Sequence, residues 1–385
     1  MIKEVFLGIS GGIAAYKACT LIRLLKKAGI GVKVVLTKNA FEFVTKTTIE
    51  TLSQEPCCFE LFANPNEMTH LKSRKLADVF VIAPATANVI AKLACGLADD
   101  LLTSSFLAYE GPKLVVPAMN SGMYNNPVTL ENIEKLRSRG IEILGPDKGV
   151  LACEDVGIGR MVEPELILQK IKVMSYPKLP LQNKKILITA GGTREKIDSV
   201  RVITNLSSGK LGHNLAHMAA LMGAKVSLVT TCKSALINPE IKDICYVESS
   251  EDMYKEVLAR MKNIDCLYMA AAVSDFVLKE ERLSKIKKQD ELVLDFKKNR
   301  DILAKVGELK KQQKLIGFCL EDQNLEAAAK DKLQRKNLDY IVANKSEVIG
   351  KDIRSVQIYD KSGLVQAIDK ADLLEISYQL LKLML

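Results

Sequence analysis

One segment of the chain, LACEDVGIGRM (151–161), combines a cysteine with acidic residues and glycines. Cys153 is followed by two acidic residues and two glycines ahead of Arg160, a composition typical of a loop rather than of an apolar helical face. A thiol in such a loop can donate a proton, because its ordinary pKa of about 8.5 is close to neutrality. The alternative is a packing role, as for other members of the chain's nine cysteines.

A glycine-rich turn near the start of the chain is suited to binding an anion. The stretch GISGGIAAYK (8–17) follows an apolar run and opens a helical pattern. Gly11 and Gly12 permit close approach to the backbone, Ser10 adds a hydroxyl, and the helix start presents N–H groups. The spacing is not the full GxGxxG of dinucleotide sites. A mononucleotide phosphate site and a tight structural turn are both open on this motif alone.

Polar residues also follow two later apolar runs of the first half. APATAN (83–88) carries Thr86 and Asn88, and PAMN (117–120) carries Asn120. Ligands bind at the carboxyl ends of strands in doubly wound sheets, although Thr and Asn are equally typical helix N-caps. His70 precedes the APATAN strand, and a lone histidine is more often structural than catalytic. Taken together, the loops favour a ligand site.

The second half opens with another strand, glycine turn and helix. ITAGGTREKIDSVRVITNLSSGKLG (188–212) has Gly191 and Gly192 after a strand, and NLSSGKLG ahead of a helix. The stretch lacks GxxxxGK[ST], so it is not a P-loop. Ser207 and Gly209 lie where donors would face a phosphate at the helix start. Asn205 is either a ligand contact or a simple turn residue.

Charged residues further along the chain give weaker signals. Asp275 ends the apolar run AAAVSDF (270–276), a position suited to a nucleotide or a metal ion. Lys285 belongs to the lysine run KIKKQ (285–289), and Lys332 and Lys336 are four apart, on one face of a helix. A solvated surface is the default interpretation of each of these lysines, so on their own they give little support for a phosphate site.

The composition narrows the class of protein. The chain has 385 residues, of which 48% are hydrophobic, a net charge of +9 and no tryptophan. Its length predicts two domains, and the mild charge makes nucleic-acid binding a weak interpretation. We see no secretory signal, and no apolar run approaches the ~20 residues of a membrane helix. Nine cysteines without CxxC or framework spacing predict a reducing cytoplasm and no zinc site.

Short apolar runs alternate with helical patterns in both halves, which predicts two doubly wound α/β domains with mostly parallel sheets. Strands are expected at 4–9, 31–37, 79–85, 113–119, 185–190, 224–230, 266–273 and 340–344, helices at 14–29 and 209–222, and a hairpin at 355–368. The proline-containing stretch 173–185 has no clear period. We therefore expect domains at 1–175 and 185–385, joined by a linker at 176–184.

The first half resembles the phosphopantothenoylcysteine decarboxylases, which are flavoproteins with a flavodoxin-like fold. The resemblance rests on SGGIAAYK, THL…LAD, APATANVIAKLACGLADDLLT, PAMNSGMY and ACEDVGIGRM, in that order over about residues 1–175. It implies a trimer with bound FMN that decarboxylates a cysteinyl carboxylate. His70 would be the base, Asn120 the binder of the substrate carboxylate, and Cys153 the proton donor. The flavin contacts that the resemblance implies are Ser10, Gly11, Gly12, Thr37, Thr86 and Asn88.

The second half resembles the phosphopantothenate–cysteine ligases over about residues 184–385, with a Rossmann-like fold. The order of the two halves is that of the bifunctional enzymes of bacterial coenzyme A biosynthesis. The resemblance implies a dimeric ligase that activates 4'-phosphopantothenate with CTP and Mg²⁺ before cysteine attacks. Asn205 would serve the acyl intermediate, Asp275 would also hold the metal ion, and Lys285 would stabilise charge on the transferring phosphate. The CTP contacts that it implies are Asp275, Lys285, Phe318, Lys332 and Lys336.

The ligase pattern is not matched everywhere. The usual AGPT is AGGT here, KNPDIL is KNRDIL with Arg300, and GFAAET is GFCLED (317–322). The last two departures fall near the expected nucleotide site, so CTP and ATP both stay open. Two other functions share the flavin motifs. A peptidyl-cysteine decarboxylase would have no use for a ligase half, and flavoproteins that regulate a phosphatase carry an acidic tail where this chain reads ISYQLLKLML.

Overall fold

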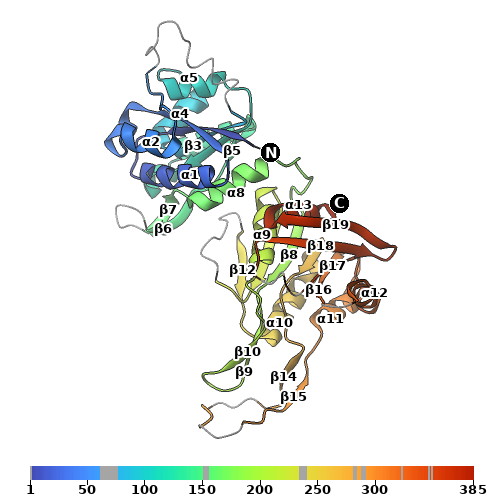
Figure 1. Cartoon of the computed structure of the whole chain (residues 1–385). Coiled ribbons are helices and arrows are strands. Elements are labelled where there is room, and N and C mark those ends of the chain that lie inside the picture. Colours follow the sequence, from blue (N-terminus) through green and yellow to red (C-terminus); the bar gives the residue numbers. More distant parts are fainter. Residues whose placement is uncertain are drawn as a thin grey trace. The chain divides into compact units, whose positions relative to one another are not determined.

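The computed structural model describes residues 2–60, 77–150, 156–233, 241–280, 284–287, 292–321, 324–345, 347 and 350–385. Two residues expected at the first site, His70 and Cys153, lie outside these ranges. The chain divides into two compact units, Met1–Pro177 and Lys178–Leu385 (Figure 1). Within the described ranges, no helix is long and apolar enough to cross a membrane.

Five parallel strands form the sheet of the first unit, in the order β2-β1-β3-β4-β5 of flavodoxin-like folds. The strands are β1 (Glu4–Ile9), β2 (Gly31–Leu36), β3 (Val79–Ala85), β4 (Lys113–Pro117) and β5 (Glu142–Ile143). Every residue of β3 is buried, as expected for a parallel sheet covered on both faces. The predicted α/β fold with mostly parallel strands is confirmed.

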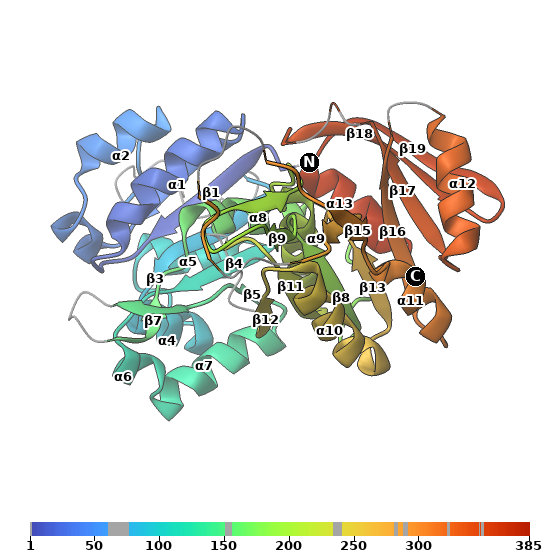
Figure 2. The same cartoon turned by 90° about the horizontal axis from the view of Figure 1, so that it is seen from below.

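Helices cover both faces of this sheet (Figure 2), with α1 and α2 on one side and α4, α6 and α7 on the other. The apolar side chains of α4, α5 and α7 form one core with Phe80 and Ile82 of β3. On the other side, α1 contacts α8. The helices are α1 (Ala15–Lys27), η1 (Lys38–Glu42), α2 (Lys46–Ser53), α4 (Ala87–Cys95), α5 (Leu101–Ala108), α6 (Ser121–Tyr124), α7 (Pro127–Ser138) and α8 (Pro164–Met174).

A two-stranded hairpin of β6 (Asp147–Val150) and β7 (Val156–Arg160) completes the first unit. The glycines of 151–161 predict a loop, and for 156–160 this expectation is wrong. A Cβ atom on Gly157 would lie 2.0 Å from Ser121 Oγ, and one on Gly159 would lie 2.2 Å from the carbonyl oxygen of Met119. The glycines therefore allow β7 to lie directly against the loop that follows β4 and the first residue of α6.

The second unit is built on an eight-stranded sheet, in the order β12-β11-β8-β13-β16-β17-β18-β19. The first six are parallel, and β18 and β19 add an antiparallel hairpin at one edge, as the sequence predicts. The strands are β8 (Lys185–Ala190), β11 (Lys225–Thr230), β12 (Asp243–Tyr246), β13 (Cys266–Met269), β16 (Lys314–Leu320), β17 (Tyr340–Asn344), β18 (Ile353–Asp360) and β19 (Gly363–Asp372).

Helices α10, α11 and α12 pack on one face of this sheet around Leu267 and Leu315, while α9 and α13 contact each other on the opposite face. There the hydroxyl of the buried Tyr268 donates to the carbonyl oxygen of Leu380, at 2.8 Å. The helices are α9 (Lys210–Leu221), α10 (Ser250–Arg260), η3 (Met261–Asn263), α11 (Ile302–Leu309), α12 (Leu325–Arg335) and α13 (Leu373–Lys382).

Two short antiparallel hairpins project from the second unit (Figure 1). They pair β9 (Arg194–Lys196) with β10 (Val202–Thr204), and β14 (Phe276–Leu278) with β15 (Phe296–Lys298). Neither is predicted from the sequence, because three-residue strands give no readable alternation.

Candidate active sites

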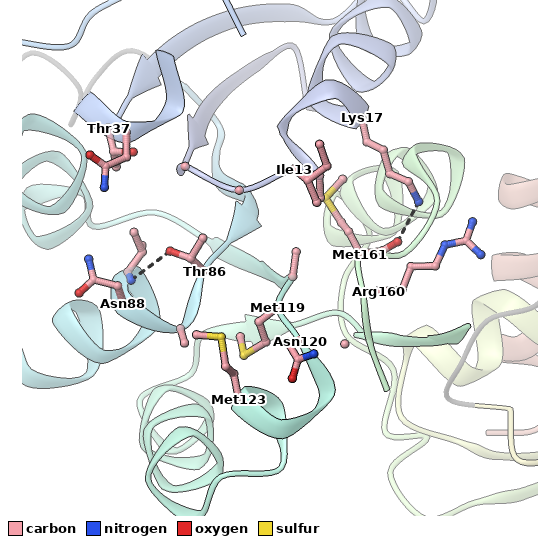
Figure 3. Close-up of a pocket in the computed structure, with 18 of the residues that line it drawn as sticks. Ile13, Lys17, Thr37, Thr86, Asn88, Met119, Asn120, Met123, Arg160 and Met161 are labelled. Atoms are coloured by element: carbon pink, nitrogen blue, oxygen red, sulfur yellow. Dashed lines mark hydrogen bonds between the residues drawn. The ribbon is translucent and has the colours of Figure 1, made fainter. Parts of the chain in front are cut away.

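The carboxyl ends of β1, β2, β3 and β4 meet at one edge of the first sheet and enclose a cavity of about 860 Å³ (Figure 3). This first-unit cavity is within the ~300–1,000 Å³ range typical of ligand sites. The residues predicted from the sequence that line it are Gly11, Gly12, Thr37, Thr86, Asn88 and Asn120.

The glycine-rich turn lies against the loop that follows β2. A Cβ atom on Gly11 would lie 2.6 Å from the Cβ of Asn39 and 2.7 Å from its carbonyl carbon, so only glycine fits there. Gly12 has more room, because its added Cβ would meet only Thr86 Cγ2, at 3.4 Å. Close approach of two loops, rather than of a ligand, is thus the reason for the first glycine.

Ser10 is buried and is not part of the cavity wall. Its hydroxyl donates to the carbonyl oxygen of Pro84 at 2.8 Å and accepts the N–H of Thr86 at 3.0 Å. The serine therefore joins the loops that follow β1 and β3. Thr86 is the N-cap of α4, with its side chain accepting the N–H of Val89, and it lines the cavity as well.

Asn120 lies across the cavity from Thr37, beside Met119 and Met123 (Figure 3). It is the N-cap of α6, and its Oδ1 accepts the N–H of Gly122 at 2.8 Å. Backbone pairing between Met119 N–H and the carbonyl oxygen of Gly159, at 2.9 Å, joins this loop to β7. The arrangement places an amide and two soft apolar side chains on one wall.

Thr37 carries the clearest sign of a missing partner in this cavity. Its Oγ1 is buried and has no hydrogen-bond partner among the described residues. A buried, unsatisfied hydroxyl is unfavourable by about 1–3 kcal/mol. A ligand with a polar group at this point would satisfy it.

Lys17 is a cavity residue that the sequence analysis missed. It is 7% exposed, and its Nζ donates to the carbonyl oxygen of Met161 and to Glu163 Oε1, both at 3.0 Å. Glu163 also pairs with Arg160, which lines the cavity near Lys17 (Figure 3). A signal was available, because Lys17 falls on the apolar face of α1, four residues before the buried Leu21.

At the corresponding edge of the second sheet, the carboxyl ends of the parallel strands β8 and β13 are neighbours. A Cβ atom on Gly192 would lie 2.7 Å from the carbonyl oxygen of Asn205, so the loop after β10 approaches the turn after β8 closely. Asn205 Nδ2 donates to the carbonyl oxygens of Ala272 and Val273, at 3.3 and 3.4 Å. Asn205 therefore lies beside the segment that follows β13, at the edge where doubly wound folds bind ligands.

Asp275 is exposed at the same edge. Asn299 fixes its loop: Asn299 N–H donates to the carbonyl oxygen of Asp275 at 2.9 Å, and Asn299 Nδ2 to that of Ser274 at 2.7 Å. In the part of the chain that the structure describes, no group of three His, Cys, Asp or Glu could hold a metal ion.

Two of the expected nucleotide contacts are lysines that already have carboxylate partners. Lys332 Nζ lies 2.8 Å from Glu321 Oε1 and 3.4 Å from the sulfur of Cys319, and Lys336 Nζ lies 2.8 Å from Asp301 Oδ2. Burial opposes the charge of Lys332, yet its hydrogen bond to Glu321 raises the pKa of the lysine overall.

The other expected contacts differ in exposure. Phe318, on β16, is half-buried, whereas Lys285 is exposed on the segment 284–287. Asn344, at the carboxyl end of β17, was missed by the sequence analysis. It is 7% exposed, and its Oδ1 has no hydrogen-bond partner within the described ranges. Its place after a buried apolar strand, in YIVAN, was the available signal.

Both halves of the chain match known families. A flavoprotein family model matches residues 1–176, and a model of the DNA/pantothenate metabolism flavoprotein C-terminal domain matches residues 181–385. The coenzyme A biosynthesis bifunctional protein CoaBC of Vibrio vulnificus (strain YJ016) is 44% identical over 359 residues, which are 92% of this chain and 89% of that protein. This chain belongs to the family of bifunctional coenzyme A biosynthesis proteins.

The match extends to other members of this family. The protein of the same name from Bacillus subtilis (strain 168) is 40% identical over 389 residues, 99% of this chain and 96% of that protein. A crystal structure of the C-terminal domain of a CoaBC protein is 39% identical and covers 52% of this chain and 94% of that domain, with a TM-score of 0.46. The sequence matches to the Vibrio and Bacillus proteins confirm the family expected from the motifs.

In this family member, Arg300 of KNRDIL lies on the surface of the second unit. Its guanidinium lies 3.2 Å from Glu251 Oε2 and 5.5 Å from the ring centroid of Tyr254, both on α10. The side chain is 67% exposed, so it adds a surface contact to α10. In GFCLED, the departing residue Cys319 is buried, and burial raises the pKa of its thiol despite the nearby Lys332.

Proposed function

We propose that this enzyme ligates cysteine to 4'-phosphopantothenate in its second unit and decarboxylates the product to 4'-phosphopantetheine in its first. The observation that carries the proposal is the first-unit cavity. It combines a glycine turn, a buried hydroxyl without a partner at Thr37, and an amide at Asn120. Family membership supports both reactions.

FMN suits the residues of this cavity. The turn at Gly11 and Gly12 and the start of α1 would hold the phosphate of FMN. The hydroxyl of Thr37 would form a hydrogen bond with a polar group of the cofactor. Met119 and Met123 offer an apolar wall to a flat ring. When bound, FMN supplies the redox chemistry that allows the cysteinyl carboxylate to leave as CO2.

The protein's own residues orient the substrate and move protons. Asn120 would bind the substrate carboxylate through its amide N–H groups, since its Oδ1 already accepts from Gly122. By their places in the motifs, His70 would act as the base and Cys153 would donate a proton to carbon after CO2 leaves. Both residues lie outside the described ranges.

In the second unit, CTP would be contacted by Asp275, Lys285, Phe318, Lys332 and Lys336. Asp275 would also hold Mg²⁺. Asn205 would act on the acyl-cytidylate intermediate of the ligation. Its contacts with the backbone after β13 support this role, because they place its side chain at the ligand-binding edge of the sheet.

The test is product analysis by mass. The full chain is incubated with 4'-phosphopantothenate, cysteine, Mg²⁺ and either CTP or ATP, and the expected result is CTP-dependent formation of 4'-phosphopantetheine with release of CO2. Lys285→Gln should lower ligation by about 10²–10³-fold, the usual effect of removing one charge-stabilising contact, while decarboxylation is unchanged. Unchanged ligation in this variant would mean that Lys285 is an ordinary surface lysine with no part in the reaction.

We further propose cytoplasmic trimers of the flavin unit and dimers of the ligase unit. Exposed apolar side chains near the two hairpins of the second unit support association there: Val200 is 67% exposed, Leu206 83% and Val293 80%. Light scattering of the full chain tests this assembly.

A further inference from the structure

A buried carboxylate in the second unit joins two segments of the proposed ligase site. The side chain of Asp198, in the turn between β9 and β10, has 0% exposure. Its Oδ1 accepts the N–H groups of Val200 and Arg201, each at 2.8 Å, and its Oδ2 accepts the N–H of Ile286 at 3.1 Å. The two ends of this last bond are 88 residues apart, so it is a tertiary contact.

This contact bears on Lys285 because Ile286 is its neighbour in the chain. Ile286 is 7% exposed, whereas Lys285 is exposed. The buried side chain of Ile286 and its backbone bond to Asp198 together fix the segment 284–287, and hence the point from which the side chain of Lys285 extends. A functional group is presented reliably only when its support is fixed in this way.

The charge of Asp198 matters for its backbone contacts. A carboxylate can accept hydrogen bonds on both oxygens, and a hydrogen bond to a charged acceptor is roughly twice as strong as one to a neutral acceptor. Arg201 adds an ion pair, with its Nη1 at 3.4 Å from Oδ2. These donors, the N–H of Val200 foremost, hold the pKa of Asp198 below its ordinary value. Asparagine at this position would place an NH2 group, which cannot accept a hydrogen bond, opposite one of the backbone N–H donors.

We propose that Asp198 is a positioning residue of the ligase reaction, which holds the segment 284–287 so that Lys285 reaches the transferring phosphate. This inference rests on the proposed role of Lys285. It adds that the lysine acts only from a backbone anchored by the carboxylate on the β9–β10 turn.

The experiment is a double-mutant cycle on the full chain, with Asp198→Asn, Lys285→Gln and both changes together. Pyrophosphate release from CTP and 4'-phosphopantothenate is followed in single turnovers, and CO2 release from 4'-phosphopantothenoylcysteine reports on the other unit. Asp360→Asn is the matched control. Asp360 also accepts two backbone N–H groups, from Ser362 at 2.7 Å and Gly363 at 3.2 Å, but within the distant β18–β19 turn.

We expect Asp198→Asn to slow pyrophosphate release by about 10- to 100-fold, as displacement of a catalytic group by about 1 Å does. Decarboxylation and the Asp360→Asn control should be unchanged. The double variant should be no slower than Lys285→Gln alone, within about twofold, because the carboxylate acts through the lysine. A merely structural role would instead multiply the two losses.

Three results of the double-mutant cycle would overturn the inference. If Lys285→Gln itself leaves activation unchanged, the proposed role of the lysine fails first. If that variant is slow but Asp198→Asn is not, or if the two losses multiply, only the positioning role fails. Hydrogen exchange on the unaltered protein gives a test that needs no variant: the Ile286 amide should be protected, and rapid exchange would contradict the anchor.

Discussion

Two adjacent glycines at the first-unit cavity allow a matched pair of substitutions, Gly11→Ala and Gly12→Ala. Both add one methyl group to the same turn. At Gly11 that methyl carbon would lie 2.6 Å from Asn39 Cβ and 2.7 Å from backbone atoms of the same residue. At Gly12 it would meet only Thr86 Cγ2, at 3.4 Å.

The size of the effect follows from these distances. Carbon atoms pack at about 3.5–4.0 Å, so Gly11→Ala requires a displacement of roughly 1 Å, and a backbone neighbour cannot rotate away. Such overpacking lowers the free energy of unfolding by about 1–3 kcal/mol. Gly12→Ala should instead raise it by about 0.4–1 kcal/mol, because alanine restricts the unfolded chain. Gly11 and Asn39 both line the cavity, so the first change also displaces its wall.

The assay has two parts. Calorimetry of the FMN-free protein should show the transition of the first unit about 2–12 °C lower in Gly11→Ala, and not lowered in Gly12→Ala. Titration with FMN should show a higher dissociation constant in Gly11→Ala to the extent that the FMN-free protein releases the strain by shifting the wall. The two effects share the same strain, so about 2–12 °C is the shift when the FMN-free protein keeps all of it, and about 5- to 150-fold weaker FMN binding is the result when the FMN-free protein releases all of it. Equal destabilisation by the two alanines would refute the argument, since their contacts differ so widely.

Three further predictions concern other parts of the chain. Thr37→Val removes a buried hydroxyl without a partner, so the FMN-free protein should become more stable while FMN binds about 2- to 12-fold more weakly; tighter or equal FMN binding would show that the hydroxyl does not face the cofactor. Cys153→Ser should release CO2 in a single anaerobic turnover but form little 4'-phosphopantetheine, because a serine hydroxyl is a far weaker acid than a thiol of pKa about 8.5; full product yield would mean that another group donates the proton. Cleavage near Pro180 should give two soluble fragments, one that retains flavin and decarboxylation and one that retains ligation, and insoluble fragments would place the boundary elsewhere.

The sequence predicts the fold best where burial is continuous. The run VFVIAPA became β3 over its whole length, and YIVAN became β17. The run 266–273 was predicted as one strand, yet β13 ends at Met269. There Ala271 N–H donates to Thr189 Oγ1, and Ala272 N–H to the carbonyl oxygen of Gly191, so the chain leaves the ladder at the site. The apolar character of a run does not show where a buried strand ends and the following loop begins.

The candidate sites were predictable to the extent that motifs follow strands. Gly11, Thr86 and Asn120 line the first-unit cavity because the carboxyl ends of parallel strands share one edge. The internal bonding of Ser10 could not be predicted, since its partner Pro84 lies 74 residues away. The anchor between Asp198 and Ile286 joins residues that are even further apart in the chain, by 88 positions. Residue type indicates which groups can react, whereas the contacts that hold them are properties of the tertiary fold.

The lysine–carboxylate pairs of the second unit have a consequence for the response to salt. Lys332 and Lys336 each have a carboxylate 2.8 Å away, so the four side chains carry no net charge before a nucleotide arrives. An incoming triphosphate would exchange one anion for another on each lysine, and screening would act on both sides of that exchange. Nucleotide affinity should therefore fall less steeply with ionic strength than two unpaired lysines would require. Such an exchange would also free Glu321 and Asp301, whose carboxylate oxygens are the kind of ligand that a divalent cation bound to the triphosphate prefers.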